Sequence, residues 1–244
     1  MDQIVIEPIK YFSGSVNLPG SKSLSNRALL LAALAEGETH LENLLLSEDT
    51  ERMLNALSQF GITINFIDEI SGLKSDQPTT QCIVTGNGKL FTPPNDGHFS
   101  LGNAGTAIRP LTSILSLCPG SFTIDGDQYM RERPIAHLAE ALVKLGARIS
   151  YLGKQGCPPI RVEGGRITGG PVSVRGDISS QYLTSLLMSL PLAPKDSEIS
   201  IIGDQVSKPY LDITLDIMQK FGVHASHSNY QIFNIAGGQQ YQSP

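Results

Sequence analysis

Polar and charged residues gather at three places in this 244-residue chain, each just before an apolar run. They are GSKS at residues 20–23, GNAGT at 102–106 and DISSQ at 177–181. Each apolar run is typical of a buried helix, so each cluster would lie at a helix N-terminus. Such an end carries unpaired N–H groups and about half a positive charge, and it therefore favours a bound anion.

Ser, Thr and Asn before a helix are often only N-caps. Lys22 and Arg27 argue for more, because a cation in the first turn lies at the unfavourable end of the helix dipole unless an anion offsets it. Arg27 follows Ser23 by about one turn, so both side chains can face one ligand. Arg109 and Arg133 could add further full charges. Together these residues favour an anion site over simple capping.

Two more clusters precede amphipathic runs, YMRERPIAHL at 129–138 and DQVSKPYLD at 204–212. Pro134 suits the first position of a helix. Either Arg131 or Arg133 can be an ordinary solvated charge, as a pair of surface arginines usually is. With two anchor points in each part of the chain, the site would suit a small polyanionic metabolite that carries hydroxyl groups.

A repeated unit would bring these clusters to one end of the molecule. Two sets of glycines recur about every 75 to 85 residues, namely Gly20, Gly102 and Gly176, and Gly61, Gly146 and Gly222. Each unit reads as strand, helix, strand, helix and closing hairpin, with the second helix ending at a glycine C-cap. We predict one α/β domain of three β-α-β-α-β-β repeats with pseudo-threefold symmetry, helices inside and sheets outside.

Composition excludes several other classes. The formal net charge is −5 and no basic run is interleaved with aromatic residues, so we expect neither nucleic acid nor membrane as a partner. Three scattered cysteines fit a reducing cytoplasm, and His224 and His227 lack further ligands at metal spacing. No nucleotide-binding glycine motif, export signal or bilayer-spanning run is visible. We expect a cytoplasmic protein without a metal or other cofactor.

Five stretches resemble the 5-enolpyruvylshikimate-3-phosphate (EPSP) synthase family: LPGSKSLSNRALLLAALAEG, LGNAGTAIRP, RERPIAHL, SSQYLTSLLM and DQVSKPYLDITL. They span essentially the whole chain and are jointly specific. The resemblance implies transfer of the enolpyruvyl group of phosphoenolpyruvate to the 5-hydroxyl of shikimate 3-phosphate, with release of phosphate and no cofactor. It also implies two similar globular halves, each made of three β-α-β-α-β-β units, which is the enolpyruvyl transferase fold.

The resemblance also assigns site residues. Those implied for phosphoenolpyruvate are Lys22, which is also the expected catalytic residue, with Asn103, Gly105, Thr106, Arg133 and Gln181. Those implied for shikimate 3-phosphate are Ser23, Arg27, Ser179, Ser180, Gln181, Ser207 and Tyr210. Gly105 would leave room for the smaller ligand, and Gln181 would lie between the two. Tyr129 departs from the family, where close relatives often place an arginine.

Length is the main departure, because the family continues into a second half that supplies the main acid–base carboxylates. Residues 1–19 would be a strand that packs with that half, 20–240 the N-terminal domain, and 241–244 a truncated crossover. The expected partners are therefore the two substrates and the missing C-terminal half, in a monomer. We expect the chain to be inactive alone, and to bind glyphosate poorly, because part of the family's glyphosate pocket is absent.

Two other functions remain open from the sequence. One is the sister family, UDP-N-acetylglucosamine enolpyruvyl transferase, which has the same fold and chemistry, although SKSLSNR and SSQ weigh against it. The other is a stand-alone module that captures a phosphorylated ligand without catalysis. Turnover after addition of a separately expressed second half would distinguish an enzyme half from such a module.

Overall fold

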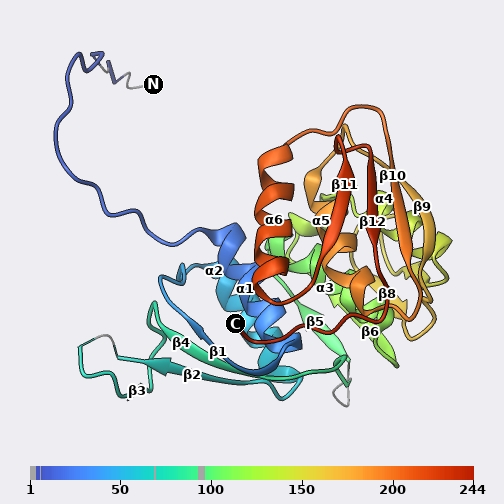
Figure 1. Cartoon of the computed structure of the whole chain (residues 1–244), viewed down its shortest axis with the longest axis horizontal. Helices are drawn as coiled ribbons and strands as arrows, with labels where there is room; N and C mark the ends of the chain where they lie inside the picture. Colours follow the sequence, from blue (N-terminus) through green and yellow to red (C-terminus); the bar gives the residue numbers. More distant parts are fainter. Residues whose placement is uncertain (1–3, 6, 69, 93–96) are drawn as a thin grey trace.

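Three four-stranded sheets surround a bundle of helices in the computed structural model of this chain (Figure 1). The structure describes residues 4–5, 7–68, 70–92 and 97–244. Each sheet belongs to one repeat, and the inner helices fill the space between the sheets. The predicted α/β fold of three repeats, with helices inside and sheets outside, is confirmed.

The first repeat runs through α1 (Lys22–Leu34), β1 (Glu36–Leu41), α2 (Glu48–Gln59), β2 (Thr63–Ile67), β3 (Lys74–Ser75) and β4 (Cys82–Asn87). The second runs through β5 (His98–Ser100), α3 (Gly105–Leu117), β6 (Ser121–Asp125), the 3₁₀ turn η1 (Met130–Glu132), α4 (Ala136–Lys144), β7 (Arg148–Tyr151) and β8 (Ile160–Glu163). The third runs through β9 (Gly170–Arg175), α5 (Ser180–Ser189), η2 (Leu190–Leu192), β10 (Ser197–Ile202), α6 (Lys208–Lys220), β11 (Ala225–Ser228) and β12 (Ile232–Ile235).

The sheets of the second and third repeats share one topology. Their strand orders are β5-β6-β8-β7 and β9-β10-β12-β11, with a parallel first pair and antiparallel neighbours after it. The first sheet has the order β1-β4-β2-β3 and therefore lacks the strand that would lie parallel to β1. A parallel pair needs a crossover connection, and α3 and α5 are the crossover helices of the two complete repeats.

The inner helices α1, α3 and α5 are buried along almost their whole length. Their small hydroxyl residues let the backbones approach, since Ser113 of α3 and Ser189 of α5 meet with their oxygens 2.6 Å apart. The hydroxyl of Ser116 donates to the carbonyl of Thr112 one turn earlier, which satisfies its buried polar group within the helix. The sequence prediction that these helices are buried on most sides is confirmed.

The outer helices α2, α4 and α6 each bury one face. Each ends at a glycine with positive φ, as the repeat pattern predicts: Gly61 (76°), Gly146 (109°) and Gly222 (76°). After α2 the amide of Ile62 donates a hydrogen bond to the carbonyl of Leu57, which at the helix end lacks the usual donor four residues later.

The position predicted for Pro134 is wrong. Helix α4 begins at Ala136 with Ile135 as its N-cap residue, so Pro134 precedes the helix by two residues. Its carbonyl instead accepts hydrogen bonds from Tyr182 Oη, at 2.9 Å, and from Arg109 Nη2, at 3.4 Å. These tertiary bonds from α3 and α5 hold the residue outside the helix.

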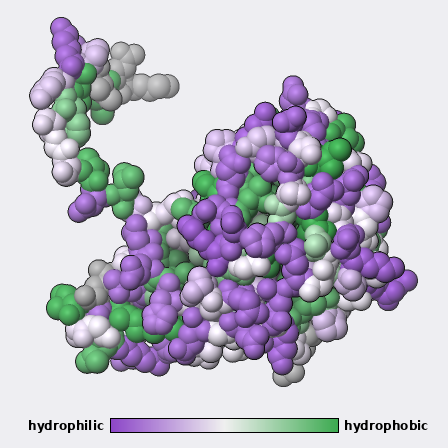
Figure 2. Space-filling model, viewed as in Figure 1, coloured by the Kyte–Doolittle hydropathy of each residue, from purple (hydrophilic) through white to green (hydrophobic). Residues whose placement is uncertain are grey.

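The strand predicted over residues 1–19 does not form among the residues described there, because those between 4 and 19 belong to no helix or strand. Residues 1–3 and 6 of the predicted N-terminal strand lie outside the described residues. The rest is an arm that leaves the body of the molecule with its apolar side chains in solvent, namely Ile4, Val5, Ile9, Tyr11, Phe12, Val16 and Leu18 (Figures 1 and 2). Contact with the body begins near Gly20, where a Cβ atom would meet the carbonyl oxygen of Asn43 at 2.0 Å.

Residues 241–243 take the place of the strand that the first sheet lacks. Gln242 forms a parallel bridge with Glu36 of β1, whose amide donates to Tyr241 O (3.0 Å) and whose carbonyl accepts from Ser243 N (3.1 Å). The Tyr241 side chain is fully buried, and its hydroxyl donates to the carbonyl of Met188 on α5 at 2.8 Å. The end of the described chain therefore joins the first repeat to the third.

We expect Tyr241→Ala to lower the free energy of unfolding by about 3–5 kcal/mol, because it leaves a cavity the size of an aromatic ring. Tyr241→Phe should cost about 1 kcal/mol, since it only leaves one buried carbonyl without a donor. Urea unfolding followed by circular dichroism measures both. Tyr11→Ala, on the exposed arm, is the control and should change nothing. Equal stability of the Tyr241 and Tyr11 alanine variants would contradict the burial described above.

Candidate functional site

A cavity of about 370 Å³ opens where the inner helices begin. Its lining contains every site residue that the family resemblance implies, that is Lys22, Ser23, Arg27, Asn103, Gly105, Thr106, Arg133, Ser179, Ser180, Gln181, Ser207 and Tyr210. Three more lining residues were not predicted: Asp49, Ile178 and Val206. The first turns of α1, α2, α3, α5 and α6 thus meet at one cavity, so backbone N–H groups and helix dipoles favour an anion there.

The side-chain charges of this lining are also mainly positive. The lining has three cations, Lys22, Arg27 and Arg133, and one carboxylate, that of Asp49. This local excess of positive charge occurs in a chain whose formal net charge is −5. A larger hollow of about 880 Å³ lies over the third sheet, but its lining holds the acids Asp196 and Glu198 and neither lysine nor arginine. Of the two, the cavity at the helix ends is the one suited to an anionic ligand.

Arg27 is a buried cation that only neutral oxygens contact. Its Nε donates to Thr214 Oγ1 (3.0 Å), its Nη1 to the carbonyl of Ser23 (2.8 Å) and its Nη2 to Thr184 Oγ1 (3.3 Å). Burial lowers the pKa of Arg27 to about 10, against a smaller opposing effect of Tyr210, so the guanidinium group stays charged at neutral pH. No carboxylate in the described part of the chain forms an ion pair with it. An anion in the cavity would supply the missing countercharge.

Arg133 is held beside the start of α3 by Asn103. Its Nη1 donates to the side-chain oxygen of Asn103 at 2.9 Å and to the backbone carbonyl of the same residue at 3.1 Å. A Cβ atom on Gly105 would lie 2.8 Å from Arg133 Nη2 and 2.7 Å from Arg109 Nη1. Glycine at position 105 therefore allows two guanidinium groups to approach the same backbone.

Arg109 lies behind the lining rather than in it. It is 6% exposed, its guanidinium group lies 5.4 Å from the ring centre of Tyr182, and its Nη1 donates to the side-chain oxygen of Gln181. Burial lowers its pKa, Tyr182 opposes that effect, and the nearby charge of Arg133 lowers the pKa further. Because Arg109 occupies the oxygen of Gln181, the amide NH₂ of Gln181 is the group left to donate to a ligand.

The opposite side of the cavity is built by α5 and α6. Ser179 caps α5 by accepting from the amide of Gln181 at 3.2 Å. Ser207, by contrast, has a left-handed backbone (φ 56°, ψ 41°) and makes no side-chain cap to α6. Left-handed residues other than glycine cost free energy and occur at functional sites. The half-exposed ring of Tyr210 and the partly exposed Ile178 and Val206 add an apolar rim.

The two arginines of the RER segment differ in what they do. Arg131 forms a side-on pair with Asp125 at the end of β6, with Nε to Oδ1 at 3.0 Å and Nη2 to Oδ2 at 2.5 Å. Burial alone would raise the pKa of Asp125, but the hydrogen bonds from Arg131 and from the amide of Gly126 lower it overall. Arg131 therefore anchors the turn η1, whereas Arg133 faces the cavity.

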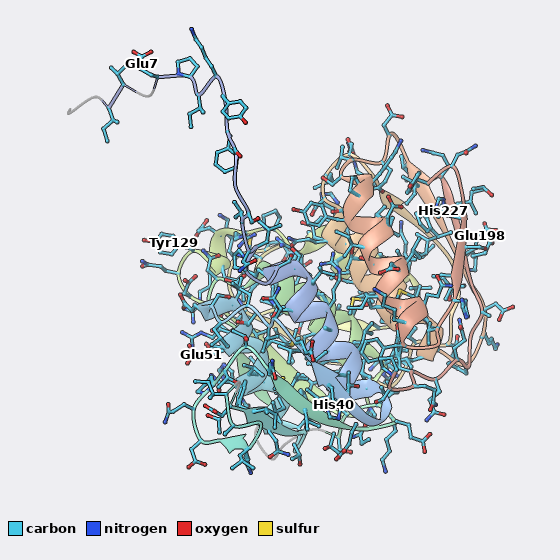
Figure 3. The ribbon with its side chains drawn as sticks, turned by 60° about the vertical axis from the view of Figure 1, so that its left-hand side comes forward. Glu7, His40, Glu51, Tyr129, Glu198 and His227 are labelled. Atoms are coloured by element: carbon cyan, nitrogen blue, oxygen red, sulfur yellow. The ribbon has the colours of Figure 1, made fainter. Side chains whose placement is uncertain are left out.

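Sequence reasoning missed Asp49, at the second position of α2. Its carboxylate oxygen Oδ2 lies 3.2 Å from Lys22 Nζ. The signal was the repeat itself, because the start of α2 corresponds to the RERP and SKPY segments of the other repeats. Tyr129 is 64% exposed at the edge of the molecule and is not part of the lining (Figure 3). Glu198 and His227 lie on the third sheet and are not part of the lining (Figure 3).

Comparison with known proteins gives one family. The family profile described as EPSP synthase (3-phosphoshikimate 1-carboxyvinyltransferase) matches residues 6–244. A curated 3-phosphoshikimate 1-carboxyvinyltransferase from Sulfurovum sp. is 50% identical over 243 residues, which is 100% of this chain and 55% of that protein. The protein of that name from Pectobacterium carotovorum is 51% identical, with 100% and 54% covered. The chain thus spans about half the length of the curated relatives it matches.

Solved structures agree on the fold. An EPSP synthase from Acinetobacter baumannii superposes with a TM-score of 0.80 at 24% sequence identity, covering 94% of this chain and 48% of that one. A second structure of EPSP synthase from the same organism gives the same score and identity, with 94% and 49% covered. No helix in the described part of this chain is long and apolar enough to cross a membrane.

We expect Gly105→Ala to weaken binding of inorganic phosphate to this cavity by about fivefold, because the new methyl group would push the Arg133 and Arg109 guanidinium groups from their positions. The displaced groups are ends of flexible side chains, so the thermal unfolding midpoint should change little. Amide shifts during a phosphate titration measure the affinity. Gly153→Ala, in an exposed turn away from the cavity, is the matched control. Unchanged phosphate affinity in the Gly105 variant would show that phosphate binding does not need the Arg133 and Arg109 guanidinium groups close to the backbone of residue 105.

Proposed function

The chain belongs to the EPSP synthase family, and on that basis we propose that it supplies the shikimate 3-phosphate half of an enolpyruvyl transferase. The reaction joins the enolpyruvyl group of phosphoenolpyruvate to the 5-hydroxyl of shikimate 3-phosphate and releases phosphate. One observation carries the proposal: every residue expected to bind these ligands lines the same cationic cavity. Both substrates are phosphorylated carboxylates, which is the ligand chemistry that such a cavity favours.

The cavity divides into two sides that suit the two ligands. We assign phosphoenolpyruvate to the side of Lys22, Gly105 and Arg133, where Asn103 orients Arg133 and Thr106 lies in the first turn of α3. We assign shikimate 3-phosphate to the side made by Ser23, Arg27, Ser179, Ser180, Ser207 and Tyr210. The hydroxyls on that side match a polyol phosphate, and we assign Gln181, which belongs to the same lining, to contact both ligands.

The proposed chemistry forms and then breaks a tetrahedral intermediate. The 5-hydroxyl group loses its proton as its oxygen bonds to C2 of phosphoenolpyruvate, and C3 gains a proton. Loss of phosphate from C2 and of a proton from C3 then gives the enol ether. Lys22 is the catalytic residue that we assign to this chain, because its ammonium group can donate to the departing phosphate. The main acid–base groups would come from the other half of the enzyme, so this chain would bind without turnover.

The same family relationship suggests how the chain sits in a whole enzyme. We propose that residues 1–19 pack on a second half, that 20–240 form one domain, and that the chain crosses between halves at 241–244. The apolar side chains of the arm support this, because a partner surface would cover them. We further propose a monomeric enzyme of the cytoplasm.

Titration of the chain with shikimate 3-phosphate tests the proposed binding. Followed through backbone amide shifts, it should give saturable changes at Ser23, Arg27, Gln181 and Tyr210, because the helix ends that form this side are already in place. A folded chain that shows no shifts there would reject the assignment of this half of the site.

Turnover tests the catalytic assignment. Mixing the chain with a separately expressed C-terminal half of a relative should restore phosphate release from the two substrates. Lys22→Met should abolish that release without changing the thermal unfolding midpoint, because this lysine is half-exposed. Lys208→Met, at the start of α6 but outside the lining, is the control and should retain activity. Full activity of the Lys22 variant would remove this lysine from the mechanism.

A further inference from the structure

Asp49 supplies the one carboxylate of the cavity lining, and a chain of polar contacts fixes it there. Asn26, which is 1% exposed on α1, donates from Nδ2 to Thr106 Oγ1 at 2.7 Å. A hydroxyl group has only one proton, and Thr106 directs it to Asp49 Oδ2 at 3.4 Å. The same carboxylate oxygen lies 3.2 Å from Lys22 Nζ. Helices α1, α2 and α3 thus meet at one negative charge.

This carboxylate therefore engages two groups, Thr106 Oγ1 and Lys22 Nζ, that could otherwise donate to a bound anion. With Asp49 in place, the Thr106 hydroxyl has no proton left for a ligand, and one N–H of Lys22 points to a fixed protein oxygen. Any anion that approaches Lys22 also approaches the charge of Asp49. That repulsion is substantial at a few ångströms, even with the screening of a partly open cavity.

The cost of this repulsion depends on the ligand. A lone phosphate bound at Lys22 has no second charged group to place elsewhere in the cavity, so it experiences the full repulsion from Asp49. A larger ligand with a second charged group gains contacts elsewhere in the cavity, which offset the repulsion. The charge of Asp49 thus separates a free phosphate ion from a phosphorylated metabolite that presents the same group.

We propose that Asp49 is a specificity-determining residue that keeps inorganic phosphate out of the Lys22 corner of the site. This inference rests on the proposed function in one respect, since phosphate is a product of that reaction and would otherwise remain bound. The carboxylate of Asp49 takes the place of a ligand anion, because it accepts the Thr106 hydroxyl proton and pairs with Lys22. It thereby disfavours small anions that lack a second charged group.

The test compares phosphate affinity in matched charge variants of this chain. Asp49→Asn keeps the shape of the side chain and an acceptor oxygen but removes the charge. Glu48→Gln removes a charge from the neighbouring position of the same helix, where the carboxylate pairs with Arg52 and does not line the cavity. Both variants lose a similar helix-dipole contribution, so a difference between them reports on the contact with Lys22 and Thr106.

Titration with inorganic phosphate at constant ionic strength, followed by amide shifts, should show about tenfold tighter binding for Asp49→Asn, as expected for removal of a like charge at this distance. Glu48→Gln should stay within about twofold of the unchanged chain. In a Lys22→Met background the effect of Asp49→Asn should shrink, since the two residues act as a pair.

Unchanged phosphate affinity in Asp49→Asn would overturn the proposal, and so would the absence of saturable binding in every variant. Weaker phosphate binding by Asp49→Asn would also overturn it, because it would show that Asp49 favours anion binding by orienting Lys22. The titration with shikimate 3-phosphate judges the proposed function separately. A chain that binds shikimate 3-phosphate but shows no effect of Asp49 rejects only this inference.

Discussion

The burial of Arg27 without a carboxylate partner is the constraint around which the site is built. This guanidinium group links α1 to α5 and α6 through hydroxyl groups of Thr184 and Thr214, so it joins the first repeat to the third. Neutral oxygens satisfy its N–H groups but leave its charge in place. A carboxylate at the same position would neutralise the charge and close the site to ligands. The fold instead leaves the countercharge to whatever enters the cavity.

The repeated architecture holds the helix N-termini at the cavity although the charge of Arg27 is buried there without a partner. Each inner helix is long enough to cross the core and apolar enough to be buried, so its N-terminus is held at the cavity by packing along its whole length. Capping varies from one helix to the next: Ser21 and Ser179 cap α1 and α5, whereas α3 and α6 begin without a side-chain cap. The tertiary packing therefore allows uncapped helix ends to face a ligand.

Much of this could be predicted from the sequence, because each signal was local and occurred three times. The apolar runs identified α1, α3 and α5, and the glycines at 61, 146 and 222 marked the ends of the outer helices. The polar clusters indicated that the site lies at the helix starts, and the resemblance to the EPSP synthase family named its individual residues. Asp49 was missed because an acid in the first turn of a helix is ordinary by itself, and only its distance to Lys22 reveals its place.

The remaining errors came from contacts between residues far apart in the chain. Pro134 fits the start of a helix locally, but Tyr182 and Arg109 hold its carbonyl. Residues 1–19 were predicted to form a strand, yet a strand needs a neighbour, and residues 241–243 occupy the edge of β1. No local pattern shows which of two distant segments a sheet edge will take.

The pairing of Glu36 with Gln242 also sets an order of events during synthesis. These partners are separated by about 200 residues, so the loop they close is nearly the whole chain, and topology of this kind folds slowly. On the ribosome, the second and third sheets can each form as their own strands emerge, but the first sheet must keep an open edge until residues 241–243 appear. The sheet whose strands are made first is thus completed after the other two.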